Sequence, residues 1–337
     1  MTSMPAENLF AVSRERGWDW REVLDMSTGI NPLGPAPGVR PALEAALDRI
    51  GFDPGSAAEE LELILSEAWG ISPELMLAGA GATGLVHFLA RVGWQGPSAI
   101  ATPAWSELHR AFPHALRLPP HEPDRWPPRG LLVLSQPADP SGEAFSPEVI
   151  REAIAAREGP VLIDETFIEF TALESAVGWC QDLPNLIVVR SLSSFQALAG
   201  LRVGVLAGSR VWIERLRRRR EPWTVNVLAG VAARAAVADT AHASRTRELV
   251  NQERNWLLEQ LSGLDGLRVS PGVANFLFAQ TDRPAADIYD WFLERKILLR
   301  NCTGMPGIAG EAIQFAVRTR PENALFVAAA REYFCAG

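Results

Sequence analysis

A glycine-rich turn near residue 80 carries the first residues whose type and spacing could do chemistry. The segment 79–84 reads Gly-Ala-Gly-Ala-Thr-Gly and follows a short apolar run, Leu75–Ala78. A turn of this kind that opens a helix offers free backbone N–H groups and the positive end of the helix dipole to an anion. The spacing therefore predicts a site for a phosphorylated ligand.

The same segment matches the Gly-x-Gly-x-x-Gly pattern of dinucleotide-binding folds, which is the competing interpretation. Such folds need an acidic residue for the ribose at the end of the next strand. The next expected strand, Ser98–Thr102, ends without one, and the motif begins far from the start of the chain. We therefore favour a phosphate site that is not a dinucleotide site.

An acidic residue follows a second apolar run. Val161–Ile163 has the pattern of a buried strand, and Asp164 comes directly after it. Open α/β sheets bind ligands at the carboxyl ends of their strands, so Asp164 is a candidate to hold a cationic group. The alternative is an aspartate that caps a helix. A third apolar run, Leu186–Val189, enters a turn rich in small residues and continues to Gly204.

The composition is that of an ordinary globular protein. The chain has 337 residues, enough for two domains, and is 47% hydrophobic and 21% charged. Its net charge of −8 and pI near 5.3 argue against nucleic acid as a partner. Leu216–Arg220 is locally basic. We interpret it as a solvated helix face, with phosphate or polyanion binding as the alternative.

Cysteine and histidine usage predicts neither disulfides nor a metal site. The three cysteines form no Cys-x-x-Cys pair, and the five histidines show no metal-ligand spacing. The N-terminus carries no basic-then-apolar signal, and no apolar run reaches about 18 residues. We therefore expect a cytoplasmic protein without a membrane partner.

The remaining pattern alternates strands and helices, which is typical of an α/β fold. Beyond residue 240 the expected elements are helices at Ala243–Leu261, Ala285–Arg295 and Pro321–Tyr333 and short strands at Asn275–Ala279, Ile297–Arg300 and Ala312–Val317. This order predicts a large α/β domain followed by a small α+β domain.

Several motifs, in the same order, resemble those of fold-type-I pyridoxal-phosphate (PLP) enzymes, in particular threonine-phosphate decarboxylases and histidinol-phosphate aminotransferases. The resemblance covers the chain from about Ser27 to Phe334. It rests on Asn-Pro-Leu-Gly at 31–34, the glycine-rich turn at 79–84, Pro-Ala-Trp-Ser-Glu at 103–107, Gln-Pro-Ala-Asp-Pro-Ser-Gly at 136–142, Asp-Glu-Thr-Phe at 164–167, the segment 186–204 and Ile-Gln-Phe-Ala-Val-Arg at 313–318. It implies a PLP-transferase fold: an N-terminal arm at 1–37, a mostly parallel seven-stranded sheet domain at 38–240 and a small domain at 241–337.

The resemblance also implies a role for each position that would contact the cofactor. Trp105 would stack on the pyridine ring, and Asp164 would hold the protonated ring nitrogen. The arm residue Asn31 would lie over the active site beside the substrate. The phosphate would be held by Gly81, Ala82, Thr83, Ser191 and Arg202.

Ser194 is the first of three departures from the family pattern. It stands where the family has its Schiff-base lysine, and a serine hydroxyl neither forms an imine nor acts as a base. Lys296 is the only lysine in the chain, and it precedes a strand of the expected small domain. The resemblance therefore implies that PLP, or its amine form pyridoxamine phosphate (PMP), binds only non-covalently.

Asp139 and Gln314 are the other two departures. At the position of Asp139 the family has an asparagine that donates to the cofactor's 3′ oxygen, whereas an ionised Asp139 has no donor. Two negative oxygens ~3 Å apart repel by roughly 5 kcal/mol at an effective dielectric of 20, so either Asp139 is protonated or the ligand is not PLP in its usual ionised form. The amine of PMP could pair with Asp139, so we expect PMP to bind more tightly than PLP. Gln314 replaces an arginine that binds the substrate carboxylate. Arg318, a second candidate, lies roughly 13 Å further along the strand.

Three functional hypotheses follow. The first is a divergent homologue that has lost the lysine-dependent reaction and keeps a pocket for a phosphorylated ligand, in the cobalamin side-chain pathway or another biosynthetic pathway. The second is an enzyme that uses PMP or PLP without a covalent link to the protein. The third is a non-catalytic partner subunit. For each, the resemblance implies a homodimer, because family active sites lie at a subunit interface.

Overall fold

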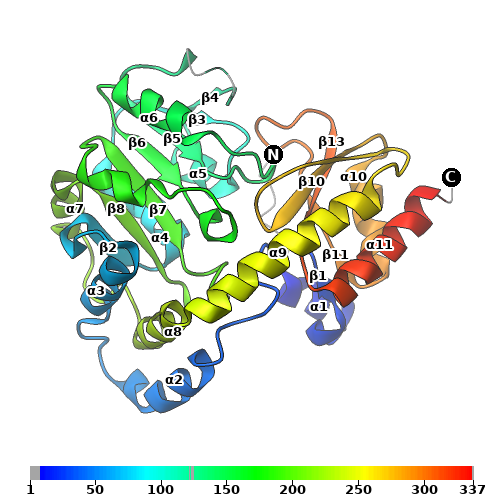
Figure 1. Ribbon diagram of the computed structural model, residues 1–337, viewed down its shortest axis with the longest axis horizontal. Coiled ribbons are helices and arrows are strands. Elements are labelled where there is room, and N and C mark those ends of the chain that lie inside the picture. Colours follow the sequence, from blue (N-terminus) through cyan, green and yellow to red (C-terminus); the bar gives the residue numbers. More distant parts are fainter. Residues whose placement is uncertain (1–7, 121, 123–124, 336–337) are drawn as a thin grey trace.

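The computed structural model describes residues 8–120, 122 and 125–335, and its largest feature is a seven-stranded sheet (Figure 1). The strand order is β2-β8-β7-β6-β5-β3-β4, and only β8 runs against the others. The expected mostly parallel seven-stranded sheet is confirmed. The strands are β2 (Met76–Gly79), β3 (Ser98–Ala101), β4 (Leu116–Leu118), β5 (Leu131–Ser135), β6 (Val161–Asp164), β7 (Leu186–Ser191) and β8 (Gly204–Gly208).

The central strands read as continuous apolar runs because helices cover both faces of the sheet. In β7, Val188 packs into the core on one face and Val189 into the core on the other, and both are fully buried. Helices α2 (Val39–Ala46), α3 (Ala57–Trp69), α6 (Pro147–Ala155) and α8 (Val227–Ala238) contribute to the first core. Helices α4 (Gly81–Phe88), α5 (Ser106–Ala111) and α7 (Arg210–Arg217) contribute to the second.

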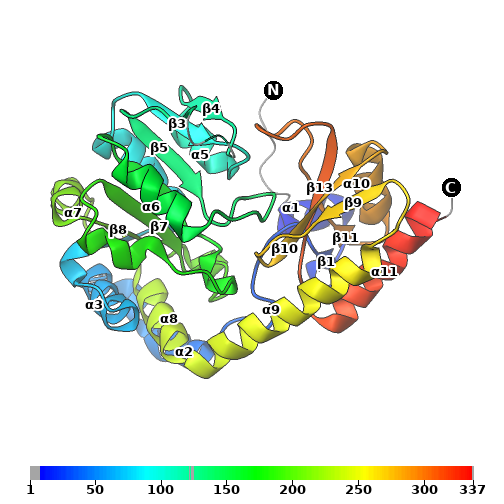
Figure 2. The same cartoon turned by 45° about the horizontal axis from the view of Figure 1, so that its top comes forward.

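The C-terminal third forms a second, antiparallel sheet of order β12-β13-β10-β9. Its strands are β9 (Leu267–Ser270), β10 (Phe276–Thr281), β12 (Arg300–Asn301) and β13 (Glu311–Ala316). Helices α10 (Ala285–Glu294) and α11 (Arg320–Cys335) pack with it, and the long helix α9 (Thr240–Leu261) runs from the large sheet to this smaller unit (Figure 2). The expected small α+β unit is therefore present.

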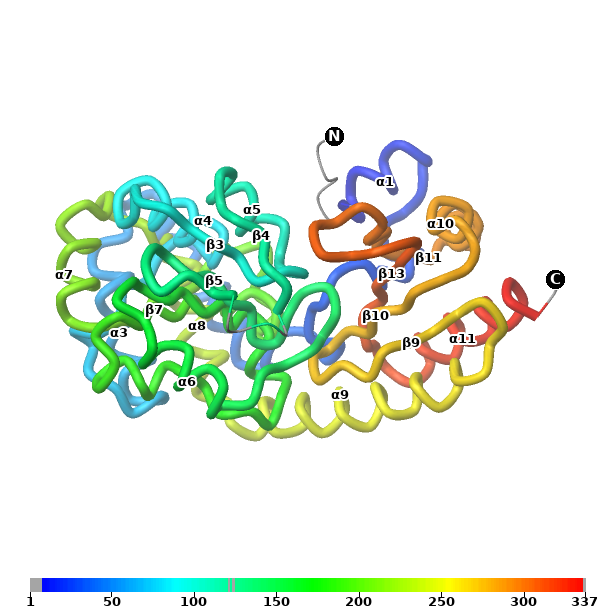
Figure 3. The backbone as a smooth tube through the Cα atoms, turned by 90° about the horizontal axis from the view of Figure 1, so that it is seen from above, coloured from blue at the N-terminus to red at the C-terminus, as the bar shows by residue number. Residues whose placement is uncertain are grey.

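The N-terminal segment lies beside this smaller unit, although the two are far apart in sequence (Figure 3). Its first described helix is α1 (Leu9–Arg16). Strand β1 (Leu24–Asp25) pairs in parallel with β11 (Ile297–Leu298). This pairing corrects the expected single strand Ile297–Arg300, which is divided between two sheets. The division depends on the pairing of β11 with β1, which is far away in sequence. The apolar run at 297–299 therefore does not reveal it.

Across the described residues, no helix combines the length and apolarity that crossing a membrane requires.

Candidate functional site

One cavity of about 270 Å³ lies at the carboxyl edge of the large sheet and is closed by the arm and the smaller sheet. It brings together most of the residues that the sequence singled out, namely Ala82, Thr83, Trp105, Asp139, Ser191, Ser194, Arg202 and Gln314. It also contains Arg300, which the sequence analysis missed. A larger groove, of about 520 Å³, lies at the opposite ends of the strands. The two charged side chains that line the groove, Arg129 and Glu158, pair with each other at 2.8 Å.

The first turn of α4 forms the anion-binding end of the cavity. Gly81 opens this helix with φ +78°, a conformation that favours glycine, and a Cβ there would lie 3.2 Å from Nη2 of Arg202. Arg202 donates from Nη2 to Oγ1 of Thr83 at 3.1 Å. The guanidinium therefore lies beside the backbone N–H groups of the helix start, and together they can bind a phosphate.

The loop that carries Ser194 is held by the N-terminal arm. The backbone N–H of Asn31 donates to the carbonyl of Ser194 at 3.0 Å, and its side-chain amide donates to the carbonyl of Phe195 and to Oγ1 of Thr246. Asn31 is buried and does not line the cavity. The amide hydrogens of Asn31 therefore fix the Ser194 loop, and the expected contact between Asn31 and a substrate stays a prediction. Lys296 pairs with Glu22 at 2.6 Å, away from the cavity-lining residues.

Trp105 and Asp164 occupy different depths of the site. Trp105 is half-buried and lines the cavity at the start of α5. Asp164 is buried behind the lining, where it accepts from the backbone N–H and from Oγ1 of Thr166, which does line the cavity. Burial raises the pKa of Asp164 to about 6, although the bonds from Thr166 lower it. A cationic group beside Asp164 would favour its ionised form.

Asp139 is paired within the protein. Its Oδ1 accepts from Nη1 of Arg300 at 2.7 Å and from Nε2 of Gln314 at 2.9 Å, and Arg300 donates from the same nitrogen to Oε1 of Gln314 at 2.8 Å. We call these three residues the Asp139 triad. Arg300 compensates the carboxylate charge, so the expected repulsion between Asp139 and a bound 3′ oxygen would be weaker than for an unpaired carboxylate. The sequence does contain a pattern that points to Arg300 as a site residue. Arg300 directly follows the apolar run Ile297–Leu299, as Asp164 follows Val161–Ile163.

Arg318 is the second candidate that the fold places elsewhere. Its Nη2 donates to Oε1 of Glu322 at 3.1 Å, and the residue is absent from the cavity lining. Arg318 lies two residues past the end of β13, whereas Gln314 lies within this strand and lines the cavity. The distance between them along the chain therefore keeps Arg318 away from the cavity. A contact between Arg318 and a substrate carboxylate would therefore need a different pose of the substrate, and it stays a prediction.

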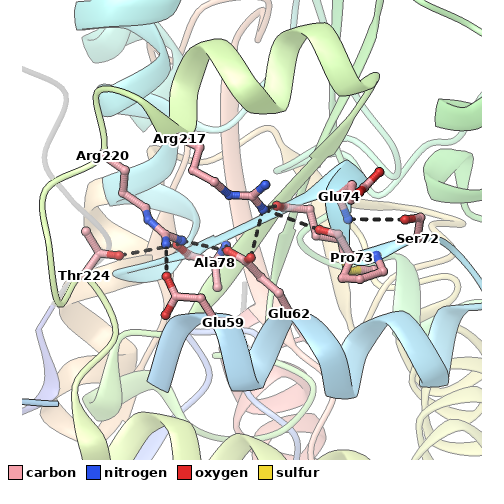
Figure 4. Close-up of polar contacts among 10 residues, drawn as sticks. Glu59, Glu62, Ser72, Pro73, Glu74, Ala78, Arg217, Arg220 and Thr224 are labelled. Atoms are coloured by element: carbon pink, nitrogen blue, oxygen red, sulfur yellow. Dashed lines mark hydrogen bonds and ion pairs between the residues drawn. The ribbon is translucent and has the colours of Figure 1, made fainter. Parts of the chain in front are cut away.

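A buried ion cluster supports the strand that leads into the anion-binding turn (Figure 4). Glu62 of α3 accepts from Arg217 at 2.9 Å, from Arg220 at 2.7 Å and from the backbone N–H of Ala78 at 2.9 Å. The two arginines also donate to the carbonyls of Met76 and Ala78. Because β2 is an edge strand, these bonds satisfy backbone groups that no neighbouring strand can reach.

The ion cluster corrects the interpretation of Leu216–Arg220 as a solvated helix face. Arg218 points to solvent, with 81% of its side chain exposed, but the side chain of Arg220 is only 11% exposed. Arg217 and Arg220 therefore bind the edge strand of the large sheet, and their charges are paired with Glu62 rather than available to an external polyanion.

The large sheet, the smaller antiparallel sheet and the cavity between them define a protein with the PLP fold-type-I architecture. Solved structures have the same fold: histidinol-phosphate aminotransferase from Sinorhizobium meliloti in complex with pyridoxal-5′-phosphate superposes with a TM-score of 0.86 at 21% identity, over 99% of this chain and 96% of the other. Residues 100–320 match the model of the aminotransferase class I and II family, and the chain belongs to that family.

Two relatives agree with this assignment over nearly their whole length. Threonine-phosphate decarboxylase from Salmonella typhimurium is 31% identical over 332 residues, which cover 92% of this chain and 91% of that protein. Histidinol-phosphate aminotransferase from Symbiobacterium thermophilum is 30% identical and covers 97% of this chain and 94% of that protein. The predicted family is thereby confirmed.

Proposed function

We propose that this chain is a divergent member of the family that binds a phosphorylated, pyridoxal-type ligand non-covalently and does not carry out the lysine-dependent reaction. The observation that carries the proposal is the lysine count. The chain has one lysine, Lys296, which pairs with Glu22 outside the cavity. Ser194, at the position that the motifs align with the family lysine, lines the cavity. The relatives' names point to phosphorylated substrates, which supports a phosphorylated ligand here.

The residues present suit a pyridoxal phosphate or pyridoxamine phosphate group apart from the missing lysine. Arg202 and the N–H groups at the start of α4 would hold the phosphate, and Gly81 leaves the space that a Cβ would occupy. Trp105 would pack on the ring, and Asp164 would face its nitrogen. When bound, such a group supplies an electron-withdrawing ring. The chain's own residues bind and orient it.

The test of this proposal combines borohydride reduction with mass spectrometry. Wild-type protein incubated with PLP is expected to carry no stoichiometric pyridoxyl adduct on Lys296, because that amine lies outside the cavity. The variant Ser194→Lys places an amine inside the cavity and is expected to gain a reducible adduct at residue 194. A stoichiometric adduct on Lys296 in the wild type would overturn the proposal.

Calorimetry with PLP, PMP and inorganic phosphate completes the test. Arg202→Gln removes a charge-assisted contact worth about 1.5–3 kcal/mol, so all three ligands are expected to bind roughly 10- to 150-fold more weakly. Arg218→Gln is the control, because the Arg218 side chain is 81% exposed. If none of the three binds the wild type at millimolar concentration, the site does not serve a phosphorylated ligand and the non-catalytic subunit hypothesis gains.

A homodimer is the second part of the proposal. Three apolar side chains are exposed within six residues after α2: Leu47 at 50%, Ile50 at 65% and Phe52 at 77%. Grouped exposed apolar side chains mark interaction surfaces, and a second copy of this chain is the partner expected for this family.

Light scattering is expected to give twice the 36.7 kDa chain mass at micromolar concentration. Phe52→Asp should shift the protein toward the monomer, because it places a charge in the interface. Val211→Asp, at a position with the same 77% exposure on α7, should not. A wild-type mass near 36.7 kDa would contradict the dimer.

A further inference from the structure

The Asp139 triad occupies the end of the cavity that Arg300 would otherwise offer to an anion. The side chains of Asp139 and Arg300 are 5% and 12% exposed, and the ion pair between them is 2.7 Å long. Gln314 binds both partners, since its Oε1 accepts from Arg300 and its Nε2 donates to Asp139. The triad therefore has both charges paired and a net charge of zero.

The strands explain why these side chains meet. Arg300 on β12 is directly opposite Gln314 on β13 in the antiparallel ladder, so the two side chains leave the same face of the sheet. Asp139 reaches them from the loop after β5. Gln314 also donates to the carbonyl of Pro140 in that loop. The triad thus links the smaller sheet to the large one across the cavity.

A second anion at this position would have to separate the ion pair. Asp139 would then keep a buried negative charge without its partner, next to the incoming anion. Asp164 is close enough that Asp139 contributes to its raised pKa. Cys302 also lies near the pair, but it is buried and burial raises the pKa of its thiol to about 12, so it stays neutral and cannot replace Arg300 as the partner of Asp139. Uncompensated buried charges are strongly unfavourable.

We infer that the Asp139 triad makes this cavity selective for ligands with one anionic group, the phosphate, and a neutral or cationic group at the opposite end. This inference rests on the proposed function and specifies its ligand class. Aminoalkyl phosphates and PMP have this charge pattern. Phosphorylated compounds with an additional carboxylate at the triad do not.

Two matched ligands test the inference by calorimetry. PMP and N-(5′-phosphopyridoxyl)glycine share the ring, the phosphate and the amine and differ by the added carboxymethyl group. Wild-type protein is expected to bind PMP at least tenfold more tightly. Asp139→Asn keeps the side-chain shape but frees Arg300, so this ratio is expected to fall below about threefold or to reverse.

A second variant keeps the test decisive if Asp139→Asn does not fold, which thermal unfolding would show. Gln314→Arg adds a guanidinium beside Arg300 and leaves Asp139 in place, and it should improve binding of the carboxylate-bearing ligand at least tenfold relative to PMP. Equal wild-type binding of the two ligands would overturn the inference alone. Binding of neither would overturn the proposed function and the inference with it.

Discussion

Glu62→Ala is expected to lower the free energy of unfolding by about 3–5 kcal/mol, the range found when one partner of a buried ion pair is removed. Glu62 is 5% exposed at its side chain and is the shared acceptor for Arg217, Arg220 and the N–H of Ala78. The variant leaves the buried Arg220 with the half-exposed Glu59 as its remaining carboxylate partner among the contacts of the cluster. It also leaves the Ala78 N–H on the edge of β2 without an acceptor.

Denaturant unfolding of Glu62→Ala and Glu60→Ala measures this effect within one helix. Glu60 is two residues away and forms a surface pair with Arg234, so its replacement should cost about 0–1 kcal/mol. Because β2 leads directly into the turn at Gly81, Glu62→Ala should also weaken phosphate binding. A loss of stability below about 1 kcal/mol would show that the cluster does not support the edge strand.

Asp164→Asn is expected to make the protein more stable at neutral pH by about 3 kcal/mol in the absence of ligand. Burial raises the pKa of Asp164 from 3.8 to about 6. The folded state therefore keeps this proton at pH values where the unfolded chain has already lost it. The free energy of unfolding consequently falls as the pH rises from about 4 to about 6. Above pH 6 the folded state has the full cost of a buried, ionised Asp164. A pKa change of this size corresponds to about 3 kcal/mol.

The measurement is the free energy of unfolding of wild type and variant between pH 4 and 7. The difference between the two proteins should be small at pH 4 and should grow to its full size by pH 7, because asparagine does not titrate. Asparagine can still accept from Thr166 through its oxygen, so packing is preserved. Asp182→Asn, at an exposed position, should give curves parallel to those of the wild type. Parallel curves for Asp164→Asn would contradict the raised pKa.

The sequence was sufficient for the fold class and for most of the cavity. Buried strands of the large sheet are continuous apolar runs, so their positions and their parallel arrangement can be read from the chain. Asp164 and the segment 79–84 each follow such a run, and the carboxyl ends of parallel strands meet at one edge. This is why residues as far apart as Thr83 and Ser194 could be expected in one site.

Only the tertiary structure decided which charged residues pair with one another. Asp139 and Arg300 are 161 residues apart, and nothing local in either segment shows that one compensates the other. The same holds for Glu62 with Arg217 and Arg220, where a run of arginines that resembles a solvated face is partly turned toward β2. Hydrophobic periodicity reports the environment of a position within its own element. The partner of a buried charge depends on which distant elements pack together, and in this chain those partners came from β12 and α3.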